Sequence, residues 1–219
     1  MNGWGVGKYE DMCDEMHECG LDIIGLNETH LRDRIEMNSN PDRYKMIGKG
    51  RNIWKKQGGG VGVLIRNSLP VSIEEIEVND CMECEDILVL KIQPVGHKDK
   101  ECMLLIICYM TTSGESAMND NVNKYESIRK IIGLHKEKKI ILMGDMNGHI
   151  GLLGEPVNNN GRLLLDFSEE LNLEILNLTM GERCPTWNAR GQVSAVDYFL
   201  VNENARQNVE RMWVDDGVG

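Results

Sequence analysis

The sequence has little proline, few aromatic residues and no long apolar run. Five of its 219 residues are proline, and aromatic residues make up 5% of the chain. No stretch reaches the roughly 18 consecutive apolar residues that a membrane-spanning helix requires, so we expect no membrane partner. The first ten residues lack the charged-then-apolar pattern of a secretion signal, which predicts an intracellular protein, nuclear or cytoplasmic.

Basic residues are also few. The chain has 24 lysines and arginines against 35 aspartates and glutamates, which gives a formal net charge of −11. Proteins that neutralise many phosphates are usually basic, so this balance argues against tight non-specific binding to nucleic acid. It does not exclude a nuclease, because a bound divalent cation supplies positive charge that a residue count omits. Any contact with nucleic acid is therefore expected to be transient.

The seven cysteines do not form a recognisable metal site. Their number is odd and no secretion signal precedes them, which favours reduced thiols. Cys81 and Cys84 form a single C-x-x-C pair, which could bind zinc or do redox work. No second pair of cysteines or histidines lies at zinc spacing. We therefore interpret the cysteines as structural residues.

The apolar content is sufficient for one sizeable core. Apolar residues make up 41% of the chain and charged residues 27%, which is typical of one soluble domain, here residues 1–219. Strands are predicted at 21–26, 59–66, 71–78, 87–92, 102–109, 139–143, 173–176 and 193–201, and helices at 8–19, 122–135 and 162–171. Ser113 or Asn119 could cap the second helix. The segments 38–41 and 158–161 are predicted to be turns, and the alternation of strands and helices predicts a layered α/β fold.

Acidic and amide side chains occur at three of the predicted strands. Glu28 follows the first strand, Asp145 and Asn147 follow the strand at 139–143, and Asp197 lies inside an apolar segment. A carboxylate at the end of a buried strand costs free energy unless it is paired or binds a cation. Glu28 could instead cap the next segment, and Asp145 with Asn147 could form an Asx-turn. Asp197 is harder to explain as a turn, and the three positions together suggest one shared site.

Five motifs follow one another in a recognisable order. They are LNET at 26–29, GGVGVLI at 59–65, ICY at 107–109, ILMGDMN at 141–147, and TW at 186–187 followed by VDYFLV at 196–201. In this order they resemble the motifs of the endonuclease/exonuclease/phosphatase superfamily. The segment 159–171 adds a similarity to the endonuclease domains of non-LTR retrotransposons and their domesticated relatives. The resemblance covers nearly the whole chain.

The resemblance implies both a fold and a reaction. The fold is a four-layer α/β sandwich, with two mixed β-sheets packed face to face and helices outside. The reaction is hydrolysis of a phosphodiester, most naturally in DNA, with Glu28 as the carboxylate that binds Mg²⁺ or Mn²⁺. Asp145 would position or activate the attacking water or assist the leaving oxygen, and Asn147 and Tyr109 would contact the scissile phosphate. Asp197 would orient a catalytic histidine.

The chain departs from the family's pattern in three places. The Ser-Asp-His motif that carries the catalytic histidine would begin where the chain ends, and the first strand would precede Met1, so we expect the fold to be incomplete at both termini. The residues after Tyr109 are Met-Thr-Thr where the family usually has Ala-Pro, which puts the aim of the tyrosine in doubt. His30 and His149 lie near acidic motifs, but neither matches the position of the catalytic histidine.

Three functions stay open from the sequence. The first is a DNA endonuclease domain of retrotransposon origin. The second is a phosphatase or lipid phosphodiesterase of the same fold, against which the retrotransposon-like segment at 159–171 argues. The third is a catalytically inactive relic or a binding module, which the unmatched histidine favours and the intact acidic set disfavours.

Overall fold

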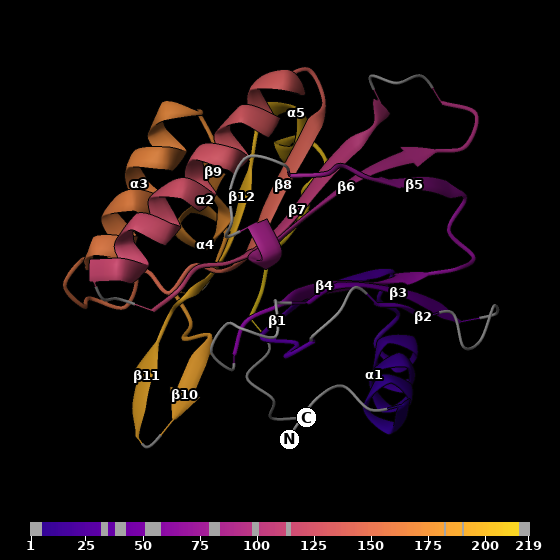
Figure 1. The fold of residues 1–219 in the computed structure, drawn as a ribbon, viewed down its shortest axis with the longest axis horizontal. Coiled ribbons are helices and arrows are strands. Elements are labelled where there is room, and N and C mark those ends of the chain that lie inside the picture. The colour runs from indigo at the N-terminus through magenta and orange to yellow at the C-terminus, as the bar shows by residue number, and fades with distance from the viewer. Residues whose placement is uncertain are drawn as a thin grey trace.

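Two β-sheets pack face to face, and helices cover their outer faces (Figure 1). The computed structural model describes residues 6–31, 35–37, 43–50, 58–78, 84–97, 101–112, 115–181, 183–189 and 191–214. Within them, the smaller sheet has the strand order β1-β4-β3-β2 and the larger sheet has the order β5-β6-β7-β8-β12-β9. This arrangement confirms the α/β sandwich that the motifs predicted.

The smaller sheet is antiparallel throughout its described strands. These are β1 (Ile23–Asn27), β2 (Ile35–Met37), β3 (Tyr44–Lys49) and β4 (Val61–Arg66). Helix α1 (Val6–Glu18) covers the outer face, where Cys13 and Met16 pack against Met46 and Leu64. Strands β2 and β3 were not predicted from the sequence. Both sheets were expected to be mixed, and in the described residues only the larger sheet is.

The larger sheet combines one parallel strand pair with antiparallel pairs. Its strands are β5 (Val71–Glu75), β6 (Ile87–Pro94), β7 (Met103–Tyr109), β8 (Lys139–Asp145), β9 (Glu174–Ile175) and β12 (Asp197–Val201). Strands β7 and β8 are parallel and are joined by helix α2 (Glu115–Leu134). Helix α2 lies beside α3 (Asn159–Glu170) on the outer face of this sheet (Figure 1).

The remaining elements are short. They are the 3₁₀ turn η1 (Cys84–Asp86), helices α4 (Leu176–Thr179) and α5 (Glu203–Arg206), and a hairpin of β10 (Trp187–Ala189) and β11 (Gln192–Ser194). The hairpin extends away from the sandwich near the end of β1 (Figure 1). No helix in the described part of the chain is both long and apolar enough to cross a membrane.

Strand β7 shows how the core is divided into two layers. Leu105, Ile107 and Tyr109 face the smaller sheet, whereas Ile106 and Cys108 face the helices. Alternate side chains of a strand point to opposite faces, so a strand that is buried on both faces is apolar almost throughout. The register leaves Tyr109 as the last residue of β7 on the face between the sheets.

Several local predictions are wrong. Helix α2 begins at Glu115, so Asn119 lies inside it and cannot cap it, while Ser113 lies outside the described residues. The segment 158–161 is not a turn. Asn158 is the N-cap of α3, and its Oδ1 accepts a hydrogen bond from the backbone N–H of Gly161 at 2.7 Å. The strand predicted at 193–201 is divided into β11 and β12.

The predictions for the cysteines and for one turn fall partly outside the described residues. Cys81 and the segment 38–41 are among the residues that are not described, so the C-x-x-C pair and this turn stay predictions. The cysteines whose state the structure describes are free thiols, and Cys13, Cys102 and Cys108 among them are buried.

Candidate active site

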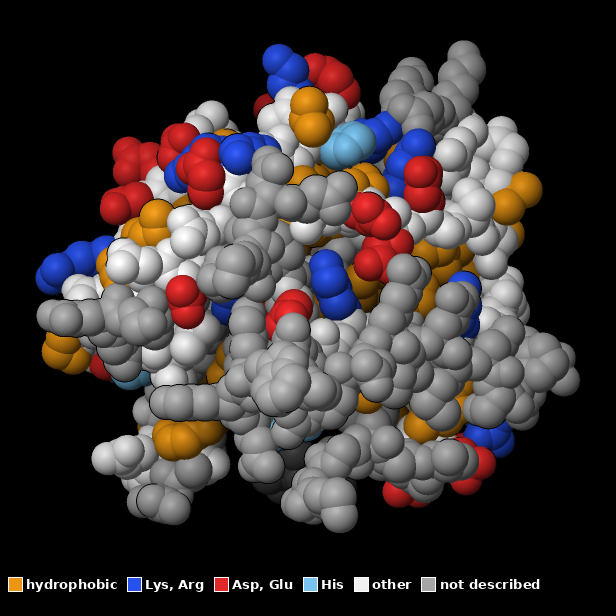
Figure 2. Space-filling model, in the orientation of Figure 1, with side chains coloured by type: hydrophobic (Ala, Val, Ile, Leu, Met, Phe, Trp, Pro, Cys, Tyr) orange, Lys and Arg blue, Asp and Glu red, His pale blue; other side chains and the backbone are white. Residues whose placement is uncertain are grey.

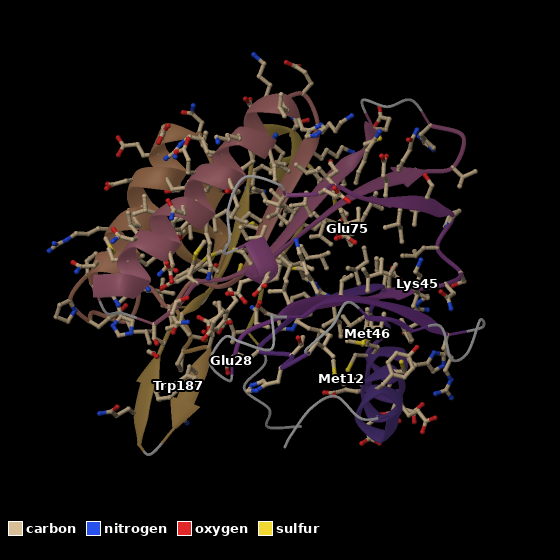
Figure 3. The ribbon with its side chains drawn as sticks, in the orientation of Figure 1. Met12, Glu28, Lys45, Met46, Glu75 and Trp187 are labelled. Carbon is tan, nitrogen blue, oxygen red and sulfur yellow. The ribbon has the colours of Figure 1, made fainter. Side chains whose placement is uncertain are left out.

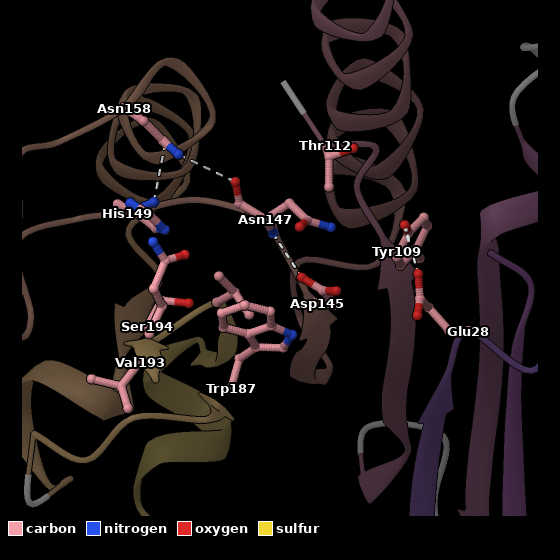
Figure 4. A pocket seen from close by; sticks show the side chains of 12 residues that line it. Glu28, Tyr109, Thr112, Asp145, Asn147, His149, Asn158, Trp187, Val193 and Ser194 are labelled. Carbon is pink, nitrogen blue, oxygen red and sulfur yellow. Dashed lines mark hydrogen bonds between the residues drawn. The ribbon is translucent and has the colours of Figure 1, made fainter. Parts of the chain in front are cut away.

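A cleft of about 720 Å³ opens where β1, β7 and β8 end. Its lining consists of Glu28, Tyr109, Thr112, Asp145, Asn147, His149, Asn158, Trp187, Gln192, Val193, Ser194 and Val196 (Figure 4). Four of the five residues that the sequence singled out are therefore in one cleft. Glu28 comes from the smaller sheet, and Trp187 comes from the hairpin at the same end of the molecule (Figure 3).

The fifth residue, Asp197, lies directly behind this lining. Strands β8 and β12 are antiparallel, and their register places Asp197 opposite Asp145. The hydroxyl of Thr186 accepts hydrogen bonds from the backbone N–H groups of Val196 and Asp197, both at 3.1 Å. The backbone carbonyl of Asp197 accepts a hydrogen bond from Asn177 at 3.0 Å. The start of β12 is thus held on both sides.

Gly144 allows the end of β8 to lie very close to the neighbouring strand β7. Its φ is +147°, and a Cβ at this position would overlap the carbonyl oxygen of Cys108 in the neighbouring strand β7. Only glycine fits a backbone that approaches its neighbour so closely with this φ. The glycine of the ILMGDMN motif is therefore required by the backbone, and it sets the position of Asp145 at the mouth of the cleft.

Asp145 and Asn147 form the Asx-turn that the sequence left as the structural alternative. Oδ1 of Asp145 accepts a hydrogen bond from the backbone N–H of Asn147 at 2.8 Å, and Asn147 has a φ of +46°. The side-chain amide of Asn147 donates to the carbonyl of Met110 at 2.7 Å. The turn does not compete with a functional role, because it fixes both side chains where they line the cleft (Figure 4).

The carboxylates of the site repel one another. Burial, followed by the charge of Asp197, raises the pKa of Asp145 to about 7, and Glu28 adds to the rise. Burial also raises the pKa of Asp197, with Glu28 contributing, while a hydrogen bond from Thr186 opposes the shift. The ionised forms are disfavoured because nearby negative charges and burial both act against them. A cation among these oxygens would relieve that cost.

Glu28 lies in a loop with an unusual backbone. Glu28 and His30 have φ values of +50° and +55°, which non-glycine residues rarely adopt. The loop is tied to the start of β4, because the N–H groups of Thr29 and His30 donate to the carbonyls of Gly60 and Gly59 at 3.2 and 3.0 Å. The Tyr109 hydroxyl donates to Oε1 of Glu28 at 3.0 Å, which joins the two sheets across the cleft.

The donor set fits a hard divalent cation. In the described residues, no three histidine, cysteine or acidic side chains are grouped closely enough to form a complete metal site. Mg²⁺ does not require such a group, because it keeps several waters and binds through one or two carboxylates. Glu28 is exposed to the cleft, and its charge is felt by both Asp145 and Asp197. Oxygen donors that repel one another are suited to such an ion.

The turn after Tyr109 is fixed without proline. The N–H and carbonyl of Thr111 are both hydrogen-bonded to the side chain of Asn121, each at 2.8 Å. The side chain of Asn160 donates to the carbonyls of Thr111 and Asn147, at 3.0 and 3.1 Å. Both asparagines are buried, and they contact each other at 3.0 Å. Their amides therefore supply the geometry that Ala-Pro was expected to give.

Sequence reasoning missed these supporting residues. The helices were predicted at 122–135 and 162–171, so Asn121 fell just before the first and Asn160 within the predicted turn at 158–161. In the structure both lie inside helices, α2 and α3, and both are buried. Asn27 was part of the first acidic motif but was assigned no role of its own. When the Asn27 amide is oriented to satisfy both neighbours, it donates to the Cys108 carbonyl at 3.2 Å and accepts from the Asp145 N–H at 2.7 Å. His149 lines the cleft and is partly buried, whereas His30 is exposed.

Comparisons with known proteins identify a family and agree with this fold. A family described as endonuclease-reverse transcriptase matches residues 103–217. No curated protein matches the sequence. Among solved structures, the endonuclease domain of TRAS1, a telomere-specific non-LTR retrotransposon, is 16% identical with a TM-score of 0.65, over 90% of this chain and 80% of that chain.

Two further solved structures have the same fold. The AP endonuclease LMAP from Leishmania major is 15% identical with a TM-score of 0.66, over 90% of this chain and 74% of that chain. The catalytic domain of APE2 from Xenopus laevis is 15% identical with a TM-score of 0.65, over 88% of this chain and 77% of that chain. At these identities the likeness establishes the fold.

Proposed function

Because the chain belongs to the endonuclease-reverse transcriptase family, we propose that residues 1–219 form one domain that hydrolyses phosphodiester bonds in nucleic acid, with DNA as the substrate. The observation that carries this proposal is the convergence of two pairs of side chains in one cleft. Glu28 and Tyr109 line one side, and Asp145 and Asn147 line the other (Figure 4). Glu28 follows β1 of the smaller sheet, whereas Tyr109, Asp145 and Asn147 lie at or just after the ends of β7 and β8 in the larger sheet, far from Glu28 in the sequence.

Each side chain has a role in this reaction. Glu28, with Asp145 nearby, would hold Mg²⁺ or Mn²⁺, which when bound polarises a phosphoryl oxygen and offsets developing charge. The amide of Asn147, which is hydrogen-bonded to the carbonyl of Met110 and to Asp145, would contact a phosphate oxygen. The carboxylate of Asp145 lines the cleft and has the acceptor oxygens that a general base needs, and a cation nearby would favour its ionised form. Asp145 therefore takes the proton of the attacking water.

A phosphodiester suits the cleft better than a phosphomonoester. None of the described residues that line the cleft is lysine or arginine, and two are acidic. A phosphomonoester carries about −1.5 to −2 charges at neutral pH, whereas a diester carries one, so the monoester is repelled more strongly. This argues against the phosphatase alternative.

The hairpin favours a polymeric substrate. Trp187 on β10 lines the cleft with its side chain 45% exposed, and Val193 on β11 lies beside it in the lining. An exposed aromatic ring can stack on a base regardless of its identity, worth about 1–3 kcal/mol. On the face in Figure 2, acidic and basic side chains of the described residues are interspersed and form no basic stripe. Contact with nucleic acid would then be brief, as the net charge predicts.

A second candidate is a cleft that binds phosphodiesters without cleaving them. The observation that favours it is the environment of Asp197, whose carboxylate is hydrogen-bonded to Thr186. The family resemblance instead assigns this carboxylate a histidine partner. A binding module would retain the nucleic-acid contacts and lack turnover.

Nicking of supercoiled plasmid with Mg²⁺ or Mn²⁺ tests the proposal, with Asp145→Asn as the inactive comparison. Cleavage of bis-(p-nitrophenyl) phosphate is compared with that of p-nitrophenyl phosphate, and DNA binding is followed by fluorescence anisotropy in EDTA. The proposal expects nicking that Asp145→Asn abolishes and a preference for the diester. Binding without nicking supports the second candidate, and turnover of the monoester alone supports a phosphatase.

A further inference from the structure

A buried ion pair lies behind the cleft and does not belong to its lining. Lys124 on α2 and Asp86 in η1 are 1% and 2% exposed, and Nζ of Lys124 lies 2.9 Å from Oδ2 of Asp86. Removing two such charges from water is costly, and buried pairs can often be replaced by apolar side chains without loss of stability. Stability alone is therefore a weak explanation for this pair.

The ion pair is part of a closed set of hydrogen bonds. Nζ of Lys124 also donates to the backbone carbonyl of Tyr109 at 2.9 Å. Oδ1 of Asp86 accepts from the backbone N–H of Gly60 at 3.0 Å. Gly60 in turn accepts from the N–H of Thr29 at 3.2 Å, and Thr29 follows Glu28 in the chain. The hydroxyl of Tyr109 completes the ring by donating to Glu28.

This ring joins five separate segments around the cleft. The segments are the Glu28 loop, Gly60 just before β4, the turn η1 with Asp86, helix α2 with Lys124, and the end of β7 at Tyr109. Lys124 links η1 to the end of β7. Glu28 lies in the positive-φ region, where the backbone is held by its surroundings against its own preference. A substitution anywhere in the ring can therefore alter the position of the Glu28 carboxylate.

Gly60 gives the ring a strict steric requirement. Its φ is +84°, and a Cβ there would lie 2.7 Å from the hydroxyl oxygen of Thr29. The hydroxyl of Thr29 is itself buried without a hydrogen-bond partner among the described residues. The fit between Gly60 and the Glu28 loop is thus close, which makes Gly60 a sensitive point for transmitting movement from Asp86 to the loop.

We propose that Asp86 and Lys124 are positioning residues that set the relative placement of Glu28 and Tyr109, the two cleft residues contributed by opposite sheets. The function of this placement rests on the proposed phosphodiester hydrolysis. Neither residue touches the substrate in this role. Asp86 acts on Glu28 through Gly60, and Lys124 acts on Tyr109 through its backbone carbonyl.

The variant Asp86→Asn/Lys124→Met tests the proposal without leaving an unpaired buried charge. The asparagine keeps an acceptor for the Gly60 N–H, and we expect the melting temperature to stay within about 4 °C of the parent. The matched control is Arg129→Met/Glu170→Gln, which removes an ion pair of 2.7 Å between α2 and α3 away from the cleft. Both double variants leave the net charge unchanged.

Two readouts follow the ring itself. The protein is labelled with 3-fluorotyrosine at its five tyrosines. The ¹⁹F resonance that is missing from the Tyr109→Phe variant belongs to Tyr109. We expect it to shift or broaden in Asp86→Asn/Lys124→Met and not in the control, while the resonance of Tyr9 is unchanged. Mn²⁺ affinity, measured by electron paramagnetic resonance without substrate, should fall about tenfold. A parent-like value of either readout in a folded variant overturns the proposal.

The two proposals fail in different ways. If the parent neither binds Mn²⁺ nor nicks DNA, the proposed function fails, and the Tyr109 resonance alone still decides whether the ring positions that side chain. If the double variant does not fold, Tyr109→Phe replaces it, because it opens the ring and leaves the ion pair. Exchange of the Gly60 amide should then be about threefold faster or more, with Leu90 of β6 unchanged. Unchanged exchange at Gly60 overturns the proposal.

Discussion

Asp145 and Asp197 lie opposite each other in the antiparallel register of β8 and β12, Asp145 as the last residue of its strand and Asp197 as the first of its own. Two acidic residues in this position repel each other, and together with burial they raise the pKa of Asp145 to about 7. The carboxylates that suit a bound cation therefore lower the stability of the folded protein when no cation is bound.

Asp145→Asn should make the metal-free protein more stable while abolishing cleavage. The folded pKa of about 7 exceeds the usual value of 3.8, so ionisation of Asp145 costs stability as the pH rises from about 4, and the cost is complete above about 7. In EDTA, urea unfolding should show a gain of about 1–2 kcal/mol at pH 8 and almost none near pH 4. Asp166→Asn, on the exposed side of α3, should show no comparable gain. Equal stability of parent and Asp145→Asn at pH 8 would contradict the repulsion.

Glu28→Gln should weaken divalent-cation binding while leaving the fold intact. The amide oxygen can still accept the hydrogen bond from Tyr109, but it lacks the charge that attracts Mg²⁺ or Mn²⁺. Calorimetric titration with Mn²⁺ should show an affinity loss of at least about tenfold. Glu74→Gln, an exposed carboxylate on β5, is the control. The assignment of Glu28 is wrong if both variants bind Mn²⁺ as the parent does.

Asn160→Ala should destabilise the turn after Tyr109. The side chain is buried and donates to the carbonyls of Thr111 and Asn147, which would lose this donor. The free energy of unfolding should fall by about 2 kcal/mol, because the variant loses both of these bonds and the buried acceptor for the Asn121 amide. The rate of nicking should also fall, since the Asn160 side chain holds the backbone of Asn147 as well. Asn123→Ala on the exposed face of α2 should leave both stability and nicking near the parent values.

Gly144→Ala should prevent normal folding of the sheet. The added Cβ would overlap the Cys108 carbonyl, and the φ of +147° is strained for any other residue. We expect a loss of about 4 kcal/mol or more in the free energy of unfolding. Gly133→Ala in α2 makes the same chemical change with nothing near its Cβ, and it should be neutral or stabilising by up to about 1 kcal/mol. Similar effects at the two positions would refute the steric explanation.

Trp187→Ala should weaken substrate binding and leave the fold unchanged. Because the ring is partly exposed and lines the cleft, its loss removes a stacking surface without opening the core. KM for plasmid nicking should rise about tenfold, in the range expected for one base stacked on an aromatic side chain. Trp213→Ala removes another exposed tryptophan outside the cleft and serves as control. If the two variants have the same KM, the hairpin does not contact nucleic acid.

The local pattern of the sequence was sufficient for much of the larger sheet. Strands β6, β7 and β8 are long apolar runs, and their alternation identifies which side chains share a face. The motifs placed Glu28, Tyr109, Asp145 and Asn147 at or just beyond the ends of strands, and all four line one cleft. Strand β2 has three residues, too few to show an alternation, and strand β3 was missed because its burial depends on packing against α1 and β4.

The sequence by itself determined the period of the strands, the glycines that close approaches require, and the order of acidic residues at strand ends. Only the tertiary structure decided which of these meet. Tyr109 reaches Glu28 across 81 residues of sequence, and Lys124 reaches Asp86 across 38. Such contacts depend on how the two sheets and a helix pack together. The strand register and the distance between the layers decide which side chains meet. The pattern of one segment carries its own period and faces, but not the register of the segment that packs against it.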